Sequence, residues 1–385
     1  MSEQQAPVVI VGTGLAGYSL AREFRKLDQA TPLVLITADD GHSYSKPMLS
    51  TGFTKGKTAR ELSMADPVAM ADQLKAVIRT FTKVTGIDTD RRCLQLGDEE
   101  LAYSKLVLAW GADVIRPAIA GTGIDQVHSI NDLLDYERFR EALHGGKRVV
   151  IMGAGLIGCE FANDLRNGGY EVDVVALCDT ALPGLLPAEA GNAVVRGLEM
   201  EGVRFHFGTT VARVDRVDSG VRVVLGNGEV LEADLVVSAI GLKPRIELAQ
   251  KAGLQVNLGI QVNRALETSA PDVYALGDCA EVDGHVLLYV LPLMACARAL
   301  AKTLAGERTE VKYGAMPVVI KTPACPVVVA PAPVGAEGQW VVEGEGVDIR
   351  ALFRAPDGRL LGFALTGSHI QEKQELAREL PPIHH

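Results

Sequence analysis

The chain has 385 residues, of which 48% are hydrophobic and 22% charged, and its formal net charge is −10. This length predicts two or three domains with an ample core, and the negative charge argues against nucleic acid as the main partner. No apolar run is long enough to span a bilayer, and the opening MSEQQAP lacks the basic segment of a signal peptide. A cytoplasmic protein is therefore expected.

Six cysteines are spread along the chain, at Cys93, Cys159, Cys178, Cys279, Cys296 and Cys325. None forms a Cys-x-x-Cys pair of the kind that dithiol oxidoreductases use. No Cys/His spacing fits a zinc ligand set, so no metal site is expected. Most of these cysteines lie among apolar residues, which predicts buried and unreactive thiols.

The chain begins with a strand, a glycine-rich turn and a helix. The apolar residues Val8–Val11 lead into Gly12-Thr13-Gly14-Leu15-Ala16-Gly17, and a helix is expected at about Leu15–Leu27. This order of elements turns a weak glycine motif into the prediction of a dinucleotide site. The three glycines permit a tight turn, close approach of a pyrophosphate and close packing of helix on strand, while the helix N-terminus offers free N–H groups to phosphate. For a single copy, an ordinary βα turn is the alternative.

A second strand, Leu33–Thr37, completes a β-α-β unit. Asp39 follows this strand, near the place where such folds set an acid against the ribose hydroxyls. A plain loop acid is the alternative. The next stretch, HSYSKPMLSTGFTKGK, is rich in turn formers and cations and is not expected in the core.

A helix is expected at Asp66–Leu74, followed by a region of short strands and hairpins. The expected strands are Val77–Phe81, Lys83–Ile87, Arg92–Leu96 and Lys105–Ala109. The last of them belongs to the buried run LVLAWGA and ends near Gly111, where backbone can lie against a ligand. A further helix is expected within Asn131–Leu143, whose apolar residues share one face.

The middle of the chain repeats the opening construction. The strand residues Val149–Ile151 lead into Gly153-Ala154-Gly155-Leu156-Ile157-Gly158 and a helical pattern, so two copies predict two nucleotide sites in one polypeptide. The next strand, Val172–Leu177, carries Ala176 where many such folds have the ribose-binding acid. No arginine follows to receive a 2′-phosphate, which favours NADH over NADPH although the usual acid for NADH is also missing.

The apolar run Leu235–Gly241 mirrors Leu106–Gly111, so the two dinucleotide domains are expected to share one plan. Further along, DVYALGDCAEV places Asp278 directly after a strand and a glycine. Such an aspartate can cap the following helix or accept a hydrogen bond from a ribityl hydroxyl. A helix is expected at Met294–Leu304, and the tail after it is rich in strand residues, with a hairpin turn at Pro356–Gly358.

Four motifs together carry a family resemblance: GTGLAG, GAGLIGCE, VVSAIGLKPR and TSAPDVYALGDCAEV. In this order they cover nearly the whole chain and resemble the FAD-dependent pyridine-nucleotide reductases of the glutathione reductase-like fold. The stretches HSYSKPMLSTGF, NDLLDYERFR, GCEFANDL, YVLPLMACARALA and KTPACPVVV are similar to the branch of that family that passes electrons from NADH to rubredoxin in bacterial alkane hydroxylation. The resemblance implies an α/β fold with two Rossmann-like domains, for FAD and for NAD, and a small α+β C-terminal domain.

The implied domains are a discontinuous FAD-binding domain at 1–112 and 242–318, an NAD-binding domain at 113–241 and a C-terminal domain at 319–385. The resemblance assigns cofactor binding to Gly12, Thr13, Gly14, Leu15, Ala16, Gly17, Thr37, Asp39, Lys46, Val84, Ala109, Gly111, Gly153, Gly155, Leu156, Ile157, Gly158, Glu160, Gly241, Gly277, Asp278, Val290 and Lys321. The catalytic candidates are Glu160, Lys46 and Lys321. Glu160 matches a position near the nicotinamide and the flavin N5, whereas in the alternative interpretation it is only an exposed helix residue at a domain seam. Positive charge from the lysines is expected to stabilise the reduced flavin.

Two departures from the family pattern bear on these assignments. Thr37 stands where disulfide reductases of this fold carry a ribose-binding glutamate. Lys46 and Thr51 stand where many oxygenase-coupled ferredoxin reductases have an arginine and a lysine that flank a Pro-Pro-Leu-Ser loop. The lysine that would pair with Glu160 is thus displaced, and Lys46 or Lys321 is expected to replace it.

The missing cysteine pair sets the expected electron route, because electrons must then leave the flavin directly for an external one-electron acceptor. The implied cycle is hydride transfer from NADH to the flavin N5, followed by single-electron transfers to two rubredoxins. Rubredoxin is small and acidic, so this acidic protein is expected to present a local basic patch. The candidates for the patch are Lys46, Lys55, Lys57, Lys321 and Arg116. As the plain alternative, the loop lysines are only solvated.

Three other functions stay open from the sequence. A [2Fe–2S] ferredoxin is one alternative acceptor. An NADH oxidase or peroxidase of the same fold would want a redox cysteine within Lys46–Gly52, where none stands. A non-catalytic flavin-binding interaction protein is the third, and its flavin would not be bleached by NADH.

Overall fold

The computed structural model describes residues 6–384, so residues 1–5, on which the expectation about a signal peptide rested, lie outside the described part. The chain forms two compact units. Unit 1 combines residues up to 46 with 63–113 and 242–313, and unit 2 combines 47–62, 114–241 and the residues from 314 onward. The expected FAD-binding segment 1–112 is therefore divided between the units, because 47–62 belongs to unit 2. The expected NAD-binding and C-terminal domains share that second unit.

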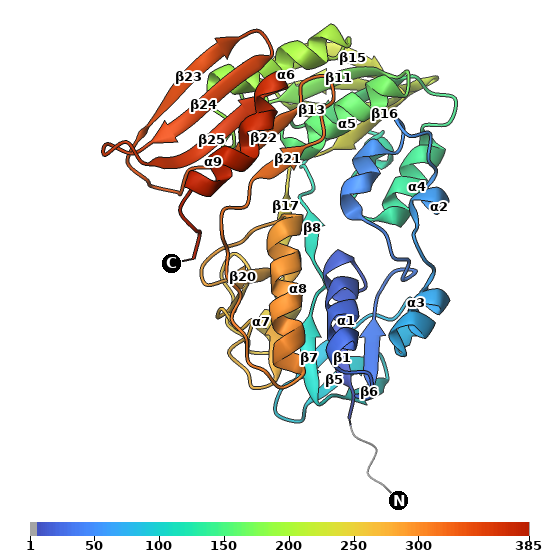
Figure 1. Cartoon of the computed structure of the whole chain (residues 1–385). Coiled ribbons are helices and arrows are strands. Elements are labelled where there is room, and N and C mark those ends of the chain that lie inside the picture. Colours follow the sequence, from blue (N-terminus) through green and yellow to red (C-terminus); the bar gives the residue numbers. More distant parts are fainter. Residues whose placement is uncertain (1–5, 385) are drawn as a thin grey trace, which may run out of the picture. The chain divides into compact units, whose positions relative to one another are not determined.

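Unit 1 is built on a parallel five-stranded sheet in the order β19-β7-β1-β2-β3. Two of its strands, β1 and β7, are labelled in Figure 1. Its strands are β1 (Val8–Val11), β2 (Leu33–Ile36), β3 (Val77–Arg79), β7 (Lys105–Leu108) and β19 (Val273–Ala275). The central strand β1 is buried at every position, which explains why its residues are apolar without alternation. It lies between β2 and β7, and its carboxyl end runs into the first glycine turn.

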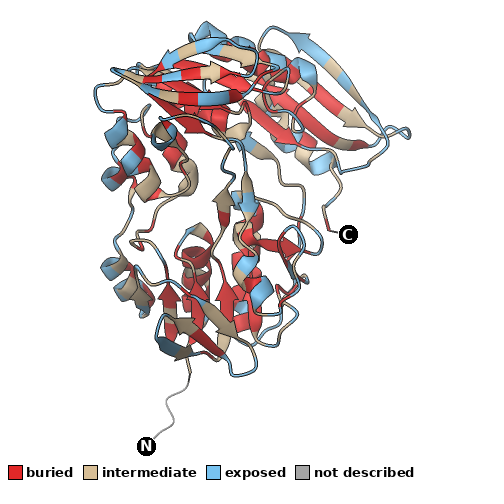
Figure 2. Ribbon diagram, turned by 180° about the vertical axis from the view of Figure 1, so that it is seen from behind, coloured by how far each residue is buried: buried red, intermediate tan, exposed pale blue. Residues whose placement is uncertain are grey.

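Helices and smaller sheets complete unit 1. Helices α1 (Leu15–Leu27) and α8 (Val290–Leu304) pack against each other, and Figure 2 shows buried residues concentrated in these helices and in the sheet. Helix α3 (Pro67–Leu74) begins after Asp66, whose side chain accepts the Ala69 N–H over 2.8 Å. The other elements are β4 (Gly86–Asp88), β5 (Cys93–Leu96), β6 (Glu99–Ala102), β17 (Leu242–Pro244), α7 (Glu247–Lys251), β18 (Ile260–Val262), η3 (Gly277–Cys279) and β20 (Ala280–Val282).

Unit 2 contains a second parallel five-stranded sheet with the same plan, in the order β12-β11-β10-β16-β9. Its strands are β9 (Val127–His128), β10 (Arg148–Met152), β11 (Glu171–Ala176), β12 (Arg204–Phe207) and β16 (Leu235–Ser238). In each sheet the strand before the glycine turn is central, and the strand after the following helix pairs with it. The predicted repeat of one plan is therefore confirmed in the sheet order.

The helices of unit 2 are α2 (Ala59–Leu62), α4 (Leu133–Ala142), α5 (Leu156–Asn167) and α6 (Ala188–Met200), with the short helix η2 (Ile124–Gln126). Strand β8 (Ala112–Val114) leads into this unit, and the 3₁₀ helix η1 (Lys46–Thr51) enters it from unit 1. A three-stranded antiparallel sheet of β13 (Val211–Val217), β14 (Gly220–Leu225) and β15 (Val230–Ala233) shares a buried valine-rich cluster with the parallel sheet.

The chain ends in a five-stranded antiparallel sheet within unit 2, in the order β21-β22-β25-β24-β23. Its elements are β21 (Val318–Ile320), β22 (Val327–Ala330), β23 (Gln339–Glu345), β24 (Asp348–Arg354), β25 (Leu360–Thr366), η4 (Gly367–Glu372) and α9 (Lys373–Glu379). The predicted turn at Pro356–Gly358 joins β24 to β25, closed by the Ala355 N–H on the Arg359 carbonyl at 2.9 Å. Within the described residues, no helix has the length and apolar character needed to cross a membrane.

The expected elements are present, and most differences lie at their ends. The strand expected at Val77–Phe81 stops at Arg79, because Phe81 adopts a positive φ of 48° that a strand does not allow. Helix α8 begins four residues before the expected Met294, since Pro292 in its first turn needs no N–H partner. One expectation is wrong: the stretch around Leu49 and Ser50 is buried, at 3% and 5% exposure. The turn-forming residues of this stretch predict a surface loop, but Leu49 and Ser50 pack inside unit 2.

Candidate functional site

The first glycine turn has the geometry of a phosphate cradle. Gly12 adopts φ +115°, and a Cβ on Gly17 would overlap the carbonyl oxygen of Gly12, so both positions need glycine. Gly14 is the N-cap of α1 and makes no side-chain cap bond, and a Cβ there would meet no atom within 4 Å among the described residues. The first N–H groups of α1 therefore face open space, which fits the phosphates of a dinucleotide.

The second glycine turn repeats this geometry in unit 2. Gly153 adopts φ +102°, and a Cβ on it would lie 2.6 Å from the Ala239 carbonyl oxygen. A Cβ on Gly158 would overlap the Gly153 carbonyl oxygen, and Gly155 is the uncapped N-cap of α5. Leu156 and Ile157 form the first residues of that helix. The donor set at both turns consists of backbone N–H groups, so each turn fits one dinucleotide.

Asp39 gathers the residues expected around the ribose of the first nucleotide. Its Oδ1 accepts the Thr37 hydroxyl at 2.6 Å, the Gly41 N–H at 3.0 Å and the Thr13 hydroxyl at 3.4 Å. Thr13 belongs to the glycine turn and Thr37 follows β2, so the structure brings together three of the expected residues. Asp39 also stabilises the turn from Thr37 to Gly41. This role agrees with the alternative interpretation of Asp39 as a loop acid.

Asp278 does not cap a helix. It lies inside η3, and helix α8 begins at Val290 with Tyr289 as its N-cap. The capping interpretation is therefore wrong. Burial raises the pKa of Asp278, and the positive charge of Lys46 partly offsets this rise. Lys46 and Asp278 thus lie together in unit 1, where Gly277 supplies a positive φ of 77°.

The remaining residues expected to bind a cofactor lie at or near the ends of strands and helices. Leu15 and Ala16 open α1, Val84 and Ala109 are buried at 8% and 5% exposure, Val290 opens α8, and Gly111 and Gly241 have positive φ values of 75° and 122°.

Glu160, in the second turn of α5, is the centre of a buried polar cluster in unit 2. Its side chain is only 4% exposed. Oε2 accepts the Ser50 hydroxyl at 2.6 Å and pairs with the ammonium of Lys321, and Oε1 accepts the Lys321 backbone N–H at 2.9 Å. The Lys321 Nζ also donates to Ser50 Oγ at 3.1 Å. The interpretation of Glu160 as an exposed residue is therefore wrong, and the partner lysine is Lys321, because Lys46 lies with Asp278 in unit 1.

Sequence reasoning missed three members of this region: Ser50, Asn163 and Asp164. Ser50 was expected outside the core, yet it contacts both Glu160 and Lys321. Asn163 and Asp164 are 1% and 2% exposed. For Asn163 and Asp164, the pattern that could have revealed them is their spacing of three and four positions from Glu160 along the same helix. No local pattern points to Ser50, which lies 110 positions from Glu160.

An aromatic cluster holds the segment 47–62 that carries Ser50. The ring of Phe53 makes edge contacts with Tyr136, Phe139 and Tyr170 at centroid distances of 6.1, 5.8 and 5.2 Å. The Arg140 guanidinium lies 4.5 Å from the centroid of the Phe53 ring and donates to the Lys57 carbonyl at 2.6 Å. The basic tip of the segment, with Lys55 and Lys57, is exposed.

All six cysteines are free thiols, and all but Cys178 are buried. Burial raises the pKa of Cys159 and of Cys279 to about 12, and that of Cys296 and of Cys325 to about 11. Thiols with such pKa values are poor nucleophiles. The expected burial is confirmed for these four and for Cys93. Among the described residues, no cluster of three or more His, Cys, Asp or Glu could hold a metal ion.

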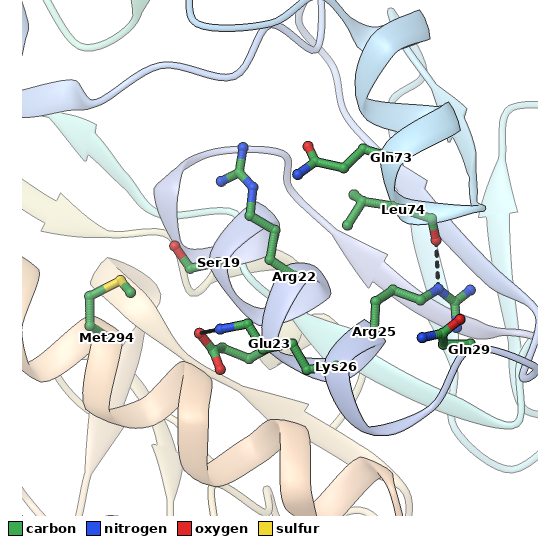
Figure 3. Close-up of a pocket in the computed structure, with 9 residues that line it drawn as sticks. All are labelled: Ser19, Arg22, Glu23, Arg25, Lys26, Gln29, Gln73, Leu74 and Met294. Atoms are coloured by element: carbon green, nitrogen blue, oxygen red, sulfur yellow. Dashed lines mark hydrogen bonds and ion pairs between the residues drawn. The ribbon is translucent and has the colours of Figure 1, made fainter.

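A depression of about 460 Å³ lies in unit 1, and its lining includes none of residues 12–17 of the glycine turn (Figure 3). It is lined by residues from α1, from the loop that follows α1, from the end of α3 and from α8: Ser19, Arg22, Glu23, Arg25, Lys26, Gln29, Gln73, Leu74 and Met294. Its charged groups already have partners, since the Arg25 Nε donates to the Leu74 carbonyl at 2.5 Å and Lys26 pairs with Glu23 at 2.7 Å.

Residues 6–302 match the family described as pyridine nucleotide-disulphide oxidoreductase, and this range contains both glycine turns and Glu160. The chain belongs to the pyridine nucleotide-disulphide oxidoreductase family. As a member of this family it uses FAD and NADH. Residues 310–380 match a second family, described as rubredoxin binding C-terminal domain. These residues include β21–β25 and Lys321.

Two curated relatives of this oxidoreductase carry the name rubredoxin-NAD(+) reductase. The protein from Alcanivorax borkumensis is 59% identical, over 98% of this chain and 99% of its own length. The protein from Acinetobacter baylyi is 47% identical, over 98% of each chain. Among solved structures, a ferredoxin reductase from Rhodopseudomonas palustris superposes with a TM-score of 0.87 at 26% identity, over 98% of this chain and 96% of that one. The predicted fold class is confirmed.

Proposed function

We propose that this protein is an FAD-dependent reductase that takes a hydride from NADH and passes single electrons to rubredoxin. The observation that carries the proposal is the rubredoxin-binding match at residues 310–380, which follows the two nucleotide-binding turns in the same chain. Lys321 belongs to the matched residues and pairs with Glu160 of the second nucleotide-binding helix. Lys321, from the region matched to rubredoxin binding, is thus bonded to Glu160, from the helix proposed to bind NADH.

The residues present fit the two cofactors. The turn at Gly12–Gly17 and the end of β2 would hold FAD together with Asp278, and the turn at Gly153–Gly158 would hold NADH. Bound FAD would supply the chemistry that turns a two-electron hydride donor, NADH, into a source of single electrons, which a metal centre of the rubredoxin type requires.

The protein side chains supply position and electrostatics. Glu160 fixes the Lys321 ammonium through Oε2 and its backbone through Oε1, so the charge of this lysine has a defined place. A fixed cation in a site shielded from water stabilises negative charge more than it would in solution. Ser50 donates to the carboxylate and accepts from the ammonium, and so orients both. No thiol is needed, and the buried cysteines agree with direct electron transfer to an external acceptor.

The partner contact is proposed to be electrostatic and short-lived. Lys55, Lys57 and Arg116 are exposed, whereas Lys46 and Lys321 are half-buried. The three exposed residues are therefore better placed to attract an acidic partner. Lys46 and Lys321 are better placed to hold positive charge near the cofactors. Contacts of this kind are small and weaken as salt is raised.

Anaerobic titration of the FAD-loaded protein with NADH tests the proposal. We expect about one equivalent of NADH to bleach the flavin, and about two equivalents of oxidised rubredoxin to restore its colour. A parallel titration with oxidised [2Fe–2S] ferredoxin is the matched control. Bleaching followed by reoxidation with ferredoxin alone would reject rubredoxin as the acceptor. A flavin that NADH does not bleach would instead indicate a non-catalytic flavin-binding protein.

We further propose that the reaction takes place in the cytoplasm and supplies an alkane hydroxylase system. The family resemblance of the sequence supports this finer assignment. Its test is reconstitution with rubredoxin and an alkane hydroxylase, with NADH oxidation followed as alkane is added. Oxidation that needs rubredoxin but gains nothing from alkane and hydroxylase would limit the proposal to rubredoxin reduction.

A further inference from the structure

Helix α5 carries three buried polar side chains on one face. Glu160, Asn163 and Asp164 are 3%, 1% and 2% exposed, and their spacing of three and four positions makes them neighbours on the helix surface. A buried polar side chain costs free energy unless it is hydrogen-bonded. Each of the three accepts hydrogen bonds from segments outside α5, so this face attaches other parts of unit 2 to the helix.

Asp164 attaches the segment 47–62. Its Oδ2 accepts the Phe53 N–H at 3.0 Å and its Oδ1 accepts the Thr54 N–H at 2.7 Å. Burial raises the pKa of Asp164, and the hydrogen bonds from Thr54 and Phe53 offset only part of the rise. An apolar side chain would serve better if packing alone were required. The carboxylate therefore serves to hold the backbone of this segment.

Asn163 attaches the segment that follows β21. Its Oδ1 accepts the Ala324 N–H at 3.0 Å. This segment is a closed turn, in which the Thr322 hydroxyl donates to the Cys325 carbonyl at 2.7 Å and the Cys325 N–H returns to the Thr322 carbonyl at 2.9 Å. Lys321 directly precedes the turn, so fixing the turn also fixes the backbone of Lys321.

Both attachment points are close in sequence to a partner of Glu160. Ser50 precedes Phe53 by three positions, and Lys321 precedes Ala324 by three positions. Ser50 and Lys321 then converge on the same carboxylate. The helix that presents Glu160 thus also fixes the two backbones that deliver its partners.

We propose that Asp164 and Asn163 are positioning residues for hydride transfer. Asp164 holds Ser50 at the Glu160 carboxylate, and Asn163 holds Lys321 there. This inference rests on the proposed function, in which Glu160 and Lys321 act beside the reacting cofactors. Each positioning residue acts through a backbone N–H group, and a displacement of about 1 Å at a catalytic group can cost roughly 100-fold in rate.

The test uses the FAD-loaded, full-length protein with the variants Asp164→Asn and Asn163→Ala. Asp173→Asn is the matched control, because Asp173 is also a buried acid of unit 2, held by Arg204 at 2.7 Å and outside the Glu160 cluster. Hydrogen exchange followed by mass spectrometry is the first readout. We expect Asp164→Asn to speed exchange in residues 47–62 and not in 321–325, Asn163→Ala to do the reverse, and the control to change neither segment.

Stopped-flow reduction of the flavin by NADH is the second readout. We expect each positioning variant to slow reduction about tenfold or more with its FAD content unchanged, and Asp173→Asn to keep the rate. In a Ser50→Ala background, Asp164→Asn should cost little further, because the group that it positions is gone. An equal fold loss in both backgrounds would mean that Asp164 affects the rate independently of Ser50, and would overturn its positioning role.

The failures of the two proposals can be told apart. A rate that is lost in Glu160→Ala but kept in Asp164→Asn and Asn163→Ala overturns the positioning roles alone. A rate that is kept in Glu160→Ala rejects the role of Glu160 in the proposed function, and the positioning roles with it. If Asp164→Asn does not fold, the same double-mutant cycle is run with Asn163→Ala and Lys321→Met. A smaller loss of rate from Asn163→Ala in the Lys321→Met background supports the positioning role of this helix face, and an equal loss overturns it.

Discussion

Lys321 and Glu160 are bonded twice, once through the lysine backbone N–H at 2.9 Å and once through its ammonium. The two residues lie 161 positions apart in the chain. Glu160 belongs to the helix of the second glycine turn, and Lys321 to the residues matched by the rubredoxin-binding family. Because the two contacts hold both the backbone and the ammonium of Lys321 on one buried carboxylate, they fix the position of the lysine charge.

Replacing Glu160 tests whether the pair serves hydride transfer. We expect Glu160→Ala to slow flavin reduction by NADH about 100-fold while FAD stays bound, because the lysine charge loses its anchor. Anaerobic stopped-flow absorbance measures the rate, and Glu199→Ala, at an exposed position of α6, is the control. Unchanged reduction in Glu160→Ala would remove this residue from the mechanism.

The two glycine turns predict two separable binding defects. A side chain on Gly158 would overlap the Gly153 carbonyl oxygen, and one on Gly17 would overlap that of Gly12. We expect Gly158→Val to raise the Kd for NADH about tenfold or more with FAD retained, and Gly17→Val to lose FAD. Flavin content and NADH titration check both outcomes. Loss of FAD in Gly158→Val would contradict the assignment of the turns.

The basic tip of segment 47–62 predicts a salt-sensitive partner contact. Lys55 and Lys57 are exposed, so replacing both by Glu should repel an acidic rubredoxin and lower kcat/KM for it about tenfold at low salt. Flavin reduction by NADH should stay the same. Steady-state turnover is measured at two salt concentrations, with Lys26 and Lys75 of unit 1 replaced by Glu as control. If turnover and its salt dependence do not change, the docking surface lies elsewhere.

Asp173 predicts a pH-dependent contribution to stability. Burial disfavours its charged form, but hydrogen bonds from Arg204 and His206 outweigh this and hold the pKa of Asp173 below its usual range. Such a group adds stability above its unfolded pKa of about 3.9 and loses it as pH falls through the lower folded pKa. We expect Asp173→Asn to lower the free energy of unfolding by about 2 kcal/mol at neutral pH, less than for a fully buried pair, because the Arg204 side chain is 56% exposed.

Urea denaturation at several pH values measures this effect. The difference between Asp173→Asn and the original protein should shrink as pH falls below about 4. A difference that is constant down to low pH would show that the carboxylate charge is not its source.

The sequence by itself determined the local plan of this protein. Helix α1 has the predicted bounds Leu15–Leu27, and β1 the predicted Val8–Val11, because an apolar strand, a glycine turn and a helical face are set by neighbours in the chain. The same holds for the glycines at Gly12 and Gly153, because glycine adopts the positive φ that these turns require without the steric cost that other residues would pay.

The tertiary structure alone decided which distant residues complete the site. Sequence reasoning left open whether Lys46 or Lys321 pairs with Glu160, and it placed Ser50 outside the core. Both questions depend on how separate segments pack, and a turn-rich stretch is buried when a helix such as α5 offers acceptors for its backbone N–H groups. Local patterns carry no information on such contacts, because hydrogen bonds between segments more than a hundred residues apart form only when the whole unit folds.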